Sequence, residues 1–478
     1  MSATIASNAF IASAGRIVGG VFALFTTIFI TRSLGTSGFG EYSTAVAFLY
    51  IFNAIADFGL YSYLVREISR TKNDERSIVG HTITLRMAFL VVLLSAGILI
   101  GQVLPYPEAV KRGMVFAAVS YFFLSSSQVL MGLFQRYLVI WKAAAAEVIS
   151  RGVQLAFVCF LFLSDEIKIE AFLGVLAVAS FVNFCVVIFF ARQHTTFTFG
   201  VSWSAWKAIA KESFPIALSL IFTLIYFRLD TVLLSLFKSA HEVGIYNISY
   251  KLLENIIFYP AMFVGLLMPA LSREAENHSE KFAELLQKGS KTLFAVAVPM
   301  VFGGVILTRP IIEMVGGTAF REAQQPFVVL LLATACIFFG TIAGAAVIAL
   351  NKQKQAIPIY FCAMVFNVLV NLVFIPQYGY MATAITTLIT EVIVTAGLCG
   401  IVGARKILPN PAFAAKVFLA GGVMVTPLFL FFNSFYDSIG LVSLIPAIVG
   451  GPIVFFAALV AVGGFSRDDF NFLFGRIH

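Results

Sequence analysis

Charged and amide side chains lie inside long apolar stretches of this sequence, and their types and spacing point to chemistry. An ionised group facing lipid is unfavourable by about 2.5–3.5 kcal/mol, so such groups are expected to face a protein interior or a water-filled cavity. Cations suit phosphate groups, and amides suit hydroxyls. The candidate substrate-binding residues are Arg16, Asn53, Arg86, Arg151, Arg228, Lys251 and Asn367, and the candidate ion-coupling residues are Asp57, Asp230 and Glu391.

Helical spacing places several of these residues on shared faces. Residues at i, i+3 or i+4 and i+7 lie on one side of a helix, and Tyr50, Asn53 and Asp57 follow this spacing. Asn367 and Asn371 do so as well, although paired asparagines also join helices by hydrogen bonds. A structural bundle needs few polar faces, so their number favours a polar path through the membrane.

Three of the cations have alternative, purely local interpretations. Arg151 lies four residues after Glu147, which favours an ion pair along one helix. Lys251 has the same option with Glu254, three residues later. Arg86 lies near one end of its apolar stretch, so its side chain is long enough to reach the membrane surface. Binding and local structure therefore both remain open for these residues.

Other charged residues have no such local partner. Arg16 lies near the middle of its stretch with no acidic residue within four positions, which favours a binding role. Asp57 and Glu391 lack a nearby basic residue in the sequence. Arg228 and Asp230 point to nearly opposite faces of one helix, so one of the two is open to a helix-packing contact.

The elements that carry these residues are apolar segments long enough to cross a bilayer. Of the 478 residues, 60% are hydrophobic and 12% are charged, against about 25% charged in ordinary soluble domains. This excludes a soluble protein, a disordered tail or a disulfide scaffold, and it predicts an all-α polytopic membrane protein with about fourteen transmembrane helices. The predicted spans are residues 8–30, 42–64, 80–104, 113–135, 143–163, 169–191, 213–236, 246–270, 290–308, 326–350, 357–376, 380–403, 413–432 and 441–463.

Lys and Arg are concentrated in the breaks after even-numbered spans, and this bias predicts the orientation of the chain. Because these residues favour cytoplasmic loops, both termini are predicted to be cytoplasmic. The net charge of +8 does not indicate nucleic acid binding, because in a membrane protein an excess of Lys and Arg usually lies in cytoplasmic loops. The remaining breaks are short, so no extramembrane domain is expected. The N-terminus lacks a basic segment before its apolar run, which favours a retained helix over a cleaved signal.

Motifs for catalysis or metal binding are missing from the sequence. The five Cys and five His residues show neither CxxC nor HExxH spacing. The phosphate-binding GxxxxGKS/T loop is also missing, which argues against an ATPase motor. The sequence therefore predicts a protein that is not an enzyme, with no catalytic residue, no metal and no cofactor.

An internal repeat divides the chain. Residues 39–42 (FGEY) align with residues 243–246 (VGIY), and six predicted spans separate the two copies. Both copies therefore run in the same direction, as in transporters whose substrate path lies between two halves. The predicted domains are an N-lobe at residues 1–200, a C-lobe at 201–405, and two further spans with a cytoplasmic tail at 406–478.

Three stretches are distinctive: RSLGTSGFGEYSTA at 32–45, YFRLDTVLLS and HEVGIYNISYKLLE within 226–254, and NVLVNLVFIPQYGYMATAITTLITE at 367–391. They resemble the polysaccharide flippase family of the multidrug/oligosaccharidyl-lipid/polysaccharide exporter (MOP) superfamily, over spans 1–12 in order. The resemblance implies two six-helix lobes around a central cavity, with two extra C-terminal helices. It also implies alternating-access transport across the bacterial inner membrane.

The function that this resemblance implies is translocation of undecaprenyl-diphosphate-linked oligosaccharides for surface polysaccharides such as O-antigen or exopolysaccharide. Arginine would replace the hydration of the diphosphate through bidentate contacts. The expected partners are the lipid-linked oligosaccharide, membrane lipid, and polysaccharide polymerase and chain-length proteins, with no nucleic acid. One alternative is a cation-coupled drug or small-molecule exporter of the same superfamily, with ion coupling through Asp57. Another is a membrane glycosyltransferase or polymerase, which the lack of a DxD cluster in the outer breaks disfavours.

Overall fold

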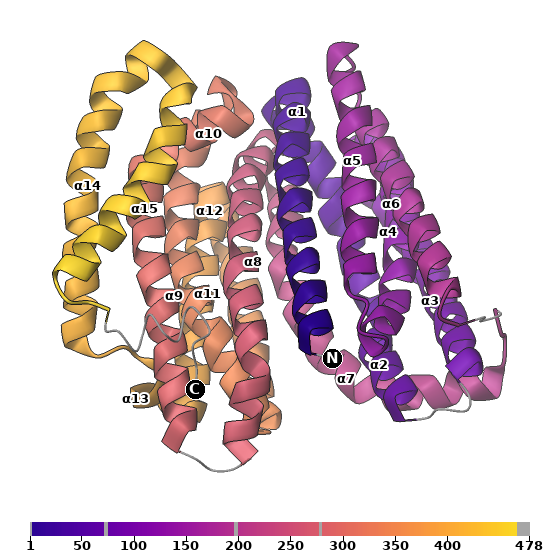
Figure 1. Ribbon diagram of the computed structural model, residues 1–478. Coiled ribbons are helices and arrows are strands. Elements are labelled where there is room, and N and C mark those ends of the chain that lie inside the picture. The colour runs from indigo at the N-terminus through magenta and orange to yellow at the C-terminus, as the bar shows by residue number, and fades with distance from the viewer. Residues whose placement is uncertain (1, 71–74, 196–198, 277–279, 466–478) are drawn as a thin grey trace. The chain divides into compact units, whose positions relative to one another are not determined.

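The computed structural model describes residues 2–70, 75–195, 199–276 and 280–465, and nearly all of this backbone is helical (Figure 1). No strand occurs within these ranges. Contacts divide the chain into two compact units, Met1–Asn247 and Ile248–His478. The predicted C-terminal tail follows the last predicted span, and from residue 466 onward it lies outside the described residues.

Each unit is a bundle of long helices with a few short ones between them (Figure 1). The first unit contains α1 (Ser2–Asp57), α2 (Leu60–Arg70), α3 (Glu75–Val103), α4 (Glu108–Arg136), α5 (Trp141–Leu163), α6 (Ile169–Arg192), α7 (Trp203–Phe237) and the start of α8 (Ala240–Glu276). The second contains the rest of α8, α9 (Glu280–Ile306), α10 (Thr308–Gly316), η1 (Thr318–Ala323), α11 (Gln324–Ala349), α12 (Gln353–Val402), α13 (Ala404–Ile407), α14 (Pro411–Ile439), η2 (Gly440–Ser443) and α15 (Leu444–Ala461).

Helix lengths confirm the predicted all-α membrane architecture. Among the described residues, 11 helical segments are long and apolar enough to cross a membrane. Two of them, in α1 and α12, contain a glycine at which two helices meet: φ is 63° at Gly35 and 56° at Gly379. Only glycine adopts this backbone region freely, so the helix direction changes within one residue. Counting each of these as two spans, and adding the 35-residue α7, gives the predicted number.

The predicted span at residues 42–64 is interrupted in the structure. α1 ends at Asp57, Phe58 and Gly59 have φ of 45° and 68°, and α2 begins at Leu60. Two successive residues with left-handed backbone end a helix, because they turn the next amide groups away from its axis. The prediction of one continuous helix was therefore wrong here, since the apolar pattern continues across the interruption.

Small polar side chains join α4 and α6 in the first unit. The hydroxyl oxygens of Ser120 and Ser180 lie 2.7 Å apart, and Ser127 donates to Asn183 Oδ1 at 2.9 Å. All four residues are buried. Small and polar residues let membrane helices approach closely and hold them together by hydrogen bonds. These bonds fix the position of α4, the helix that contains Ser125, Ser126 and Ser127, against α6.

α1 and α8 cross backbone to backbone within the first unit. A Cβ atom placed on Gly40 would lie 1.7 Å from the Ala240 oxygen, and one placed on Gly244 would lie 2.0 Å from the Thr36 oxygen. Each glycine thus meets the residue four positions before the other. These are the two glycines that the sequence repeat aligned.

α14 and α15 pack against α9 in the second unit. Their shared core includes Val298, Val417, Met424 and Phe455, and Gly421 approaches the ring of Phe302. The two helices that lie outside the sequence repeat are thus anchored by apolar packing, which is non-directional and needs no polar partner.

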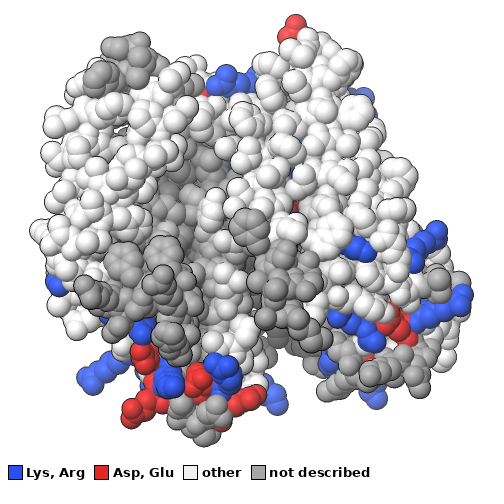
Figure 2. Space-filling view, viewed as in Figure 1, with Lys and Arg blue, Asp and Glu red and all other residues white. Residues whose placement is uncertain are grey.

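Charged side chains gather at one end of each unit (Figure 2). In the first unit this end carries α2 and the start of α7 (Figure 1), where Arg66 lies 2.7 Å from Glu212. In the second it carries α13 and the start of α9, where Lys288 lies 2.7 Å from Glu284. These ends contain breaks after even-numbered spans, as a charged membrane face requires. Their cytoplasmic location stays a prediction.

Candidate functional site

Arg86 and Asp57 form an ion pair at the interruption between α1 and α2. Arg86 Nη1 lies 2.8 Å from Asp57 Oδ1 and donates to the Ala56 carbonyl oxygen at 2.7 Å. Arg86 Nη2 donates to the Ser125 hydroxyl of α4. The guanidinium therefore neutralises the carboxylate and also satisfies a carbonyl group in the last turn of α1, which has no partner within its helix.

Burial excludes one of the two interpretations of Arg86. Its side chain is fully buried, so the alternative in which it reaches the membrane surface is wrong. Arg86 turns inward because the end of α1 offers it two acceptors, the Asp57 carboxylate and the Ala56 carbonyl oxygen. The sequence pattern does not show that a helix ends there. The Asp57 side chain stays 20% exposed. Substrate binding by Arg86 and ion coupling by Asp57 stay predictions.

A polar face of α1 continues from this pair. Tyr50, Asn53 and Asp57 share one side of the helix by their spacing, and Arg228 of α7 lies over the Tyr50 ring, 5.2 Å from its centroid. The Asn53 Oδ1 atom is buried and has no hydrogen-bond donor in the described part of the chain. Because a buried amide oxygen without a donor is unfavourable by about 1–3 kcal/mol, this atom is suited to accept a hydrogen bond from a ligand.

Asp230 makes a contact between α7 and α8. Its side chain is 2% exposed, and Oδ2 accepts a hydrogen bond from the Tyr246 hydroxyl at 3.2 Å. One residue later, Thr231 donates to Asn247 Oδ1 at 3.1 Å. Of Arg228 and Asp230, Asp230 therefore makes the helix-packing contact and Arg228 makes the aromatic one. Ion coupling by Asp230 stays a prediction.

The first half of α1 packs on α5 through small residues and presents Arg16 on its exposed side. A Cβ on Gly15 would lie 3.0 Å from Ala144 Cβ, and one on Gly19 would lie 3.8 Å from the Glu147 side chain, while Arg16 is exposed. Among the described side chains, Arg151 contacts Gln154 at 3.5 Å instead of forming the intrahelical pair with Glu147. Roles for Arg16 and Arg151 stay predictions.

In the second unit, the candidate residues of α12 form a buried amide and hydroxyl cluster. Asn371 donates to Asn367 Oδ1 at 3.2 Å, and Asn367 donates to Thr390 Oγ1 at 3.4 Å. Glu391, beside Thr390, is 4% exposed. The Asn367–Thr390 bond joins the two halves of α12 across Gly379, as the helix-joining interpretation of the asparagines expects. The Asn371–Asn367 bond lies within one turn of the first half. Substrate contact by Asn367 and ion coupling by Glu391 stay predictions.

Lys251 forms the ion pair with Glu254 that the sequence spacing offered. Its Nζ lies 3.2 Å from Glu254 Oε2, and its side chain is 42% exposed. An exposed pair of this kind contributes about 0–1 kcal/mol, so the lysine is not committed to a structural role, and its substrate-binding role stays a prediction.

Ser125 is the polar contact of the site that the sequence analysis missed. The signal was the Ser125 to Ser127 run in the apolar α4, because three consecutive hydroxyls inside a membrane span need partners. Two of these partners are Arg86 and Asn183. Within the described ranges, no group of three His, Cys, Asp or Glu side chains is placed to hold a metal ion.

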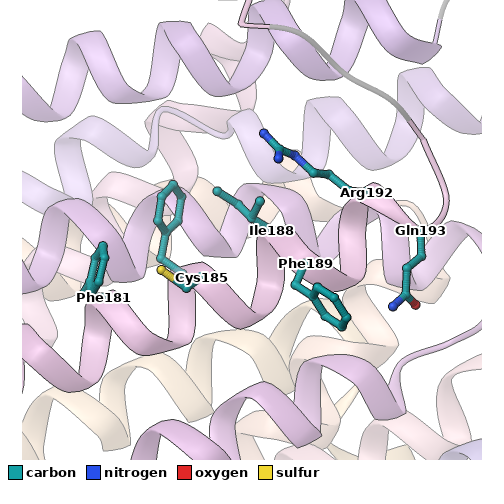
Figure 3. Close-up of a pocket in the computed structure, with 7 residues that line it drawn as sticks. Phe181, Cys185, Ile188, Phe189, Arg192 and Gln193 are labelled. Carbon is teal, nitrogen blue, oxygen red and sulfur yellow. The ribbon is translucent and has the colours of Figure 1, made fainter.

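A groove of about 470 Å³ lies on α6, away from these residues (Figure 3). It is lined by Phe181, Phe184, Cys185, Ile188, Phe189, Arg192 and Gln193. The lining contains none of the candidate residues predicted from the sequence, so the groove is a separate feature of the first unit.

Comparison with solved structures shows which known fold this chain has. The chain is similar to a lipid II flippase MurJ in an inward closed conformation, with a TM-score of 0.78, 15% identity, and coverage of 94% of this chain and 98% of that one. It is also similar to an inward-facing multidrug resistance MATE transporter of the MOP superfamily, with a TM-score of 0.63, 14% identity, and coverage of 83% and 98%. The fold is that of helical membrane transporters of this superfamily.

A family model described as polysaccharide biosynthesis protein matches residues 5–274, more than half of the chain. The chain therefore belongs to this family, the polysaccharide flippase family of the MOP superfamily, as the sequence resemblance predicted. A second model, MatE, matches residues 215–373.

Curated relatives carry compatible names. A Shigella flexneri protein named as an O-antigen transporter is 24% identical over 400 residues, covering 75% of this chain and 88% of that protein. A Haloferax volcanii protein named as the low-salt glycan biosynthesis flippase Agl15 is 20% identical over 376 residues, 75% of each chain. The match to the flippase AglR of the same organism is 23% identical over 219 residues, and it spans about half of each protein, 45% of this chain and 46% of the relative.

Proposed function

We propose that this protein translocates undecaprenyl-diphosphate-linked oligosaccharides across the bacterial inner membrane by alternating access. The observation that carries the proposal is the polar face of the first unit, where Arg228 lies over Tyr50 and the Asn53 oxygen has no donor among the described residues. Membership of the polysaccharide biosynthesis protein family and the names of the curated relatives support the same substrate class.

The chemistry of this face suits a phosphorylated sugar. A guanidinium binds phosphate oxygens through two parallel hydrogen bonds and keeps its charge at every physiological pH. A buried amide oxygen needs a donor, and sugar hydroxyls are donors. An apolar lipid tail, in contrast, gains nothing from such a face and stays in the bilayer. The proposed polar cargo is therefore the diphosphate-linked sugar.

The proposed organisation follows the internal repeat. We take residues 1–200 and 201–405 as the two lobes whose relative movement gives alternating access, and residues 406–478 as an accessory part. The reciprocal contact of Gly40 and Gly244 supports a two-fold relation between the repeats. Asp57, Asp230 and Glu391 are the proposed ion-coupling carboxylates. The proposed protein partners are polysaccharide polymerase and chain-length proteins. Both termini are proposed to lie on the cytoplasmic side of the membrane.

Replacing Arg228 with Ala is expected to lower the rate of oligosaccharide translocation about tenfold or more, because one charge-assisted contact contributes about 1.5–3 kcal/mol. Arg228→Lys is expected to retain part of the activity, since lysine keeps the charge but not the bidentate geometry. The measurement is translocation of a polyprenyl-diphosphate-linked oligosaccharide in proteoliposomes with equal amounts of protein. Arg16→Ala is tested in the same assay.

Arg112→Gln serves as the control, because Arg112 is exposed and pairs with Glu170 outside this face. Wild-type translocation by Arg228→Ala would remove this residue from the mechanism. No translocation of any lipid-linked glycan by the wild-type protein would contradict the proposed function as a whole.

A second candidate function is cation-coupled export of a small molecule. It is favoured by the match of the MatE model to residues 215–373. In the same proteoliposomes, this function would appear as movement of an amphipathic dye in response to a proton or sodium gradient, and it would require Asp57 or another coupling carboxylate. Dye transport without glycan transport would favour it over the flippase.

A further inference from the structure

The α6 groove has an apolar wall that faces outward from the bundle. Phe181 is 48% exposed and Phe189 is 64% exposed, and Cys185 between them is exposed as well. Figure 3 shows these side chains in a row along α6, with Arg192 and Gln193 at one end. In a membrane-spanning helix, exposed apolar side chains of this kind contact acyl chains of the bilayer.

The length of the groove matches one leaflet. Phe181 and Arg192 are eleven positions apart, which corresponds to about 16 Å along a helix, and half of the hydrocarbon core of a bilayer measures about 15 Å. Arg192 is the last residue of α6. An acyl chain lying in the groove would therefore place its head group beside the guanidinium.

The end of the groove is positively charged. Lys142 of α5 is 7% exposed, and its Nζ donates to Gln193 Oε1 at 2.7 Å and to His194 Nε2 at 2.8 Å. Because an ammonium group only donates, the oxygen of Gln193 must face it, and the amide NH₂ remains a donor for another group. In the described part of the chain, neither Lys142 nor Arg192 has a carboxylate within ion-pair distance.

Neighbouring contacts keep this charge in place. Glu75 accepts from Tyr137 at 2.9 Å and pairs with Arg136 at 3.0 Å, so this carboxylate is already engaged. The Tyr137 ring stacks on His194 with 4.7 Å between the ring centroids. Burial and the Lys142 cation lower the pKa of His194, which keeps its ring neutral and able to accept from Lys142. Near this end of the groove, the three cations Arg136, Lys142 and Arg192 therefore outnumber the one carboxylate, Glu75.

We propose that this groove is a binding site for an anionic phospholipid. One acyl chain lies along Phe181, Cys185 and Phe189, and the phosphate is held by Arg192 and the Gln193 amide beside the buried Lys142. Charge complementarity favours an anionic head group over a zwitterionic one. The one-leaflet length favours a phospholipid over a polyprenyl chain, which is the tail of the proposed transport substrate. The site is therefore separate from the transport path and independent of the proposed function.

The test measures binding of phosphatidylglycerol and of phosphatidylcholine with identical acyl chains to the full-length protein in detergent, by native mass spectrometry. The wild-type protein is expected to prefer phosphatidylglycerol. Arg192→Gln is expected to weaken phosphatidylglycerol binding about fivefold, because one basic residue near the surface contributes about 1 kcal/mol, and to leave phosphatidylcholine binding unchanged. Cys185→Trp fills the groove and is expected to weaken binding of both lipids.

Two matched variants act as controls. Arg405→Gln removes an exposed arginine from the charged end of the second unit, and Cys362→Trp adds the same bulk at an exposed cysteine of α12; both are expected to bind phosphatidylglycerol as the wild type does. Equal binding of the two lipids by the wild type, or unchanged selectivity in Arg192→Gln, overturns the proposal. Displacement of phosphatidylglycerol by equimolar polyprenyl phosphate also overturns it, since the groove would then hold the substrate tail.

Discussion

Replacing Gly40 with Ala is expected to lower the free energy of unfolding by about 3 kcal/mol, at the upper end of the range for overpacking a well-packed site. The added Cβ would lie 1.7 Å from the Ala240 carbonyl oxygen. A side chain in that position could rotate away, but a helix backbone cannot, so α1 and α8 must separate along their crossing. Gly244→Ala is expected to have a similar effect, because its Cβ would lie 2.0 Å from the Thr36 oxygen.

Thermal unfolding of the purified protein in detergent, followed by fluorescence-detected size exclusion, measures this effect. Gly20→Ala in α1 and Gly265→Ala in α8 are matched controls, since nothing lies within 4 Å of a Cβ at either position. Alanine is favoured over glycine inside helices by up to about 1 kcal/mol, so both controls are expected to be as stable as the wild type or more so. If the Gly40→Ala protein has the same melting temperature as the Gly20→Ala protein, the close crossing of α1 and α8 is disproved.

The double variant gives a further check on the crossing. Both substitutions are relieved by the same separation of α1 from α8, so the loss in the Gly40→Ala, Gly244→Ala protein is expected to be smaller than the sum of the single losses. Strictly additive losses would mean that the two glycines occupy independent sites, and the reciprocal contact would then be an incorrect description.

The second large effect is expected from Arg86→Ala. Removal of the guanidinium leaves the Asp57 carboxylate, the Ala56 carbonyl and the Ser125 hydroxyl without their shared partner. Breaking a buried ion pair from one side destabilises a protein by about 3–5 kcal/mol. The interruption between α1 and α2 is expected to lose its fixed geometry, and the variant is expected to be poorly folded or absent from the membrane. Its measurement is the amount of folded protein and its melting temperature.

A paired replacement separates stability from function at this site. In Arg86→Met combined with Asp57→Leu, both charges are gone, and stability is expected to return in large part because no buried charge is left alone. Recovered folding without translocation would assign the pair a role in transport. Lys251→Ala is the comparison for an exposed pair, with an expected loss of about 0–1 kcal/mol. An Arg86→Ala protein as stable as Lys251→Ala would contradict the buried pair.

Local spacing in the sequence was sufficient for some contacts of the site. The Lys251 pair with Glu254 and the Asn367 contact with Asn371 each lie within one helical turn, where distance along the chain fixes distance in space. The number of spans followed from apolar length in the same way. Local spacing did not decide between two neighbours of Arg151: Glu147 lies four residues before it and Gln154 three residues after it, and the structure has the Gln154 contact.

The apolar pattern also failed at Phe58 and Gly59. The residues on both sides remain apolar enough to continue a helix, and the interruption depends on backbone conformation and on the guanidinium that arrives from α3. Hydropathy indicates that a residue is kept away from water. It carries no information about the φ angle of that residue. The interruption was therefore visible only in the structure.

The sequence by itself determined that this chain is a helical membrane protein and that its intramembrane charges need partners, because the bilayer leaves apolar length and charge neutralisation as the dominant constraints. Its repeat and motifs indicated the family. Only the tertiary structure decided which groups meet: Asp57 with Arg86, Arg228 with Tyr50, and Gly40 with the backbone of α8. These pairs are far apart along the chain, so their contact depends on how helices pack, which is set by the combined shape of many side chains.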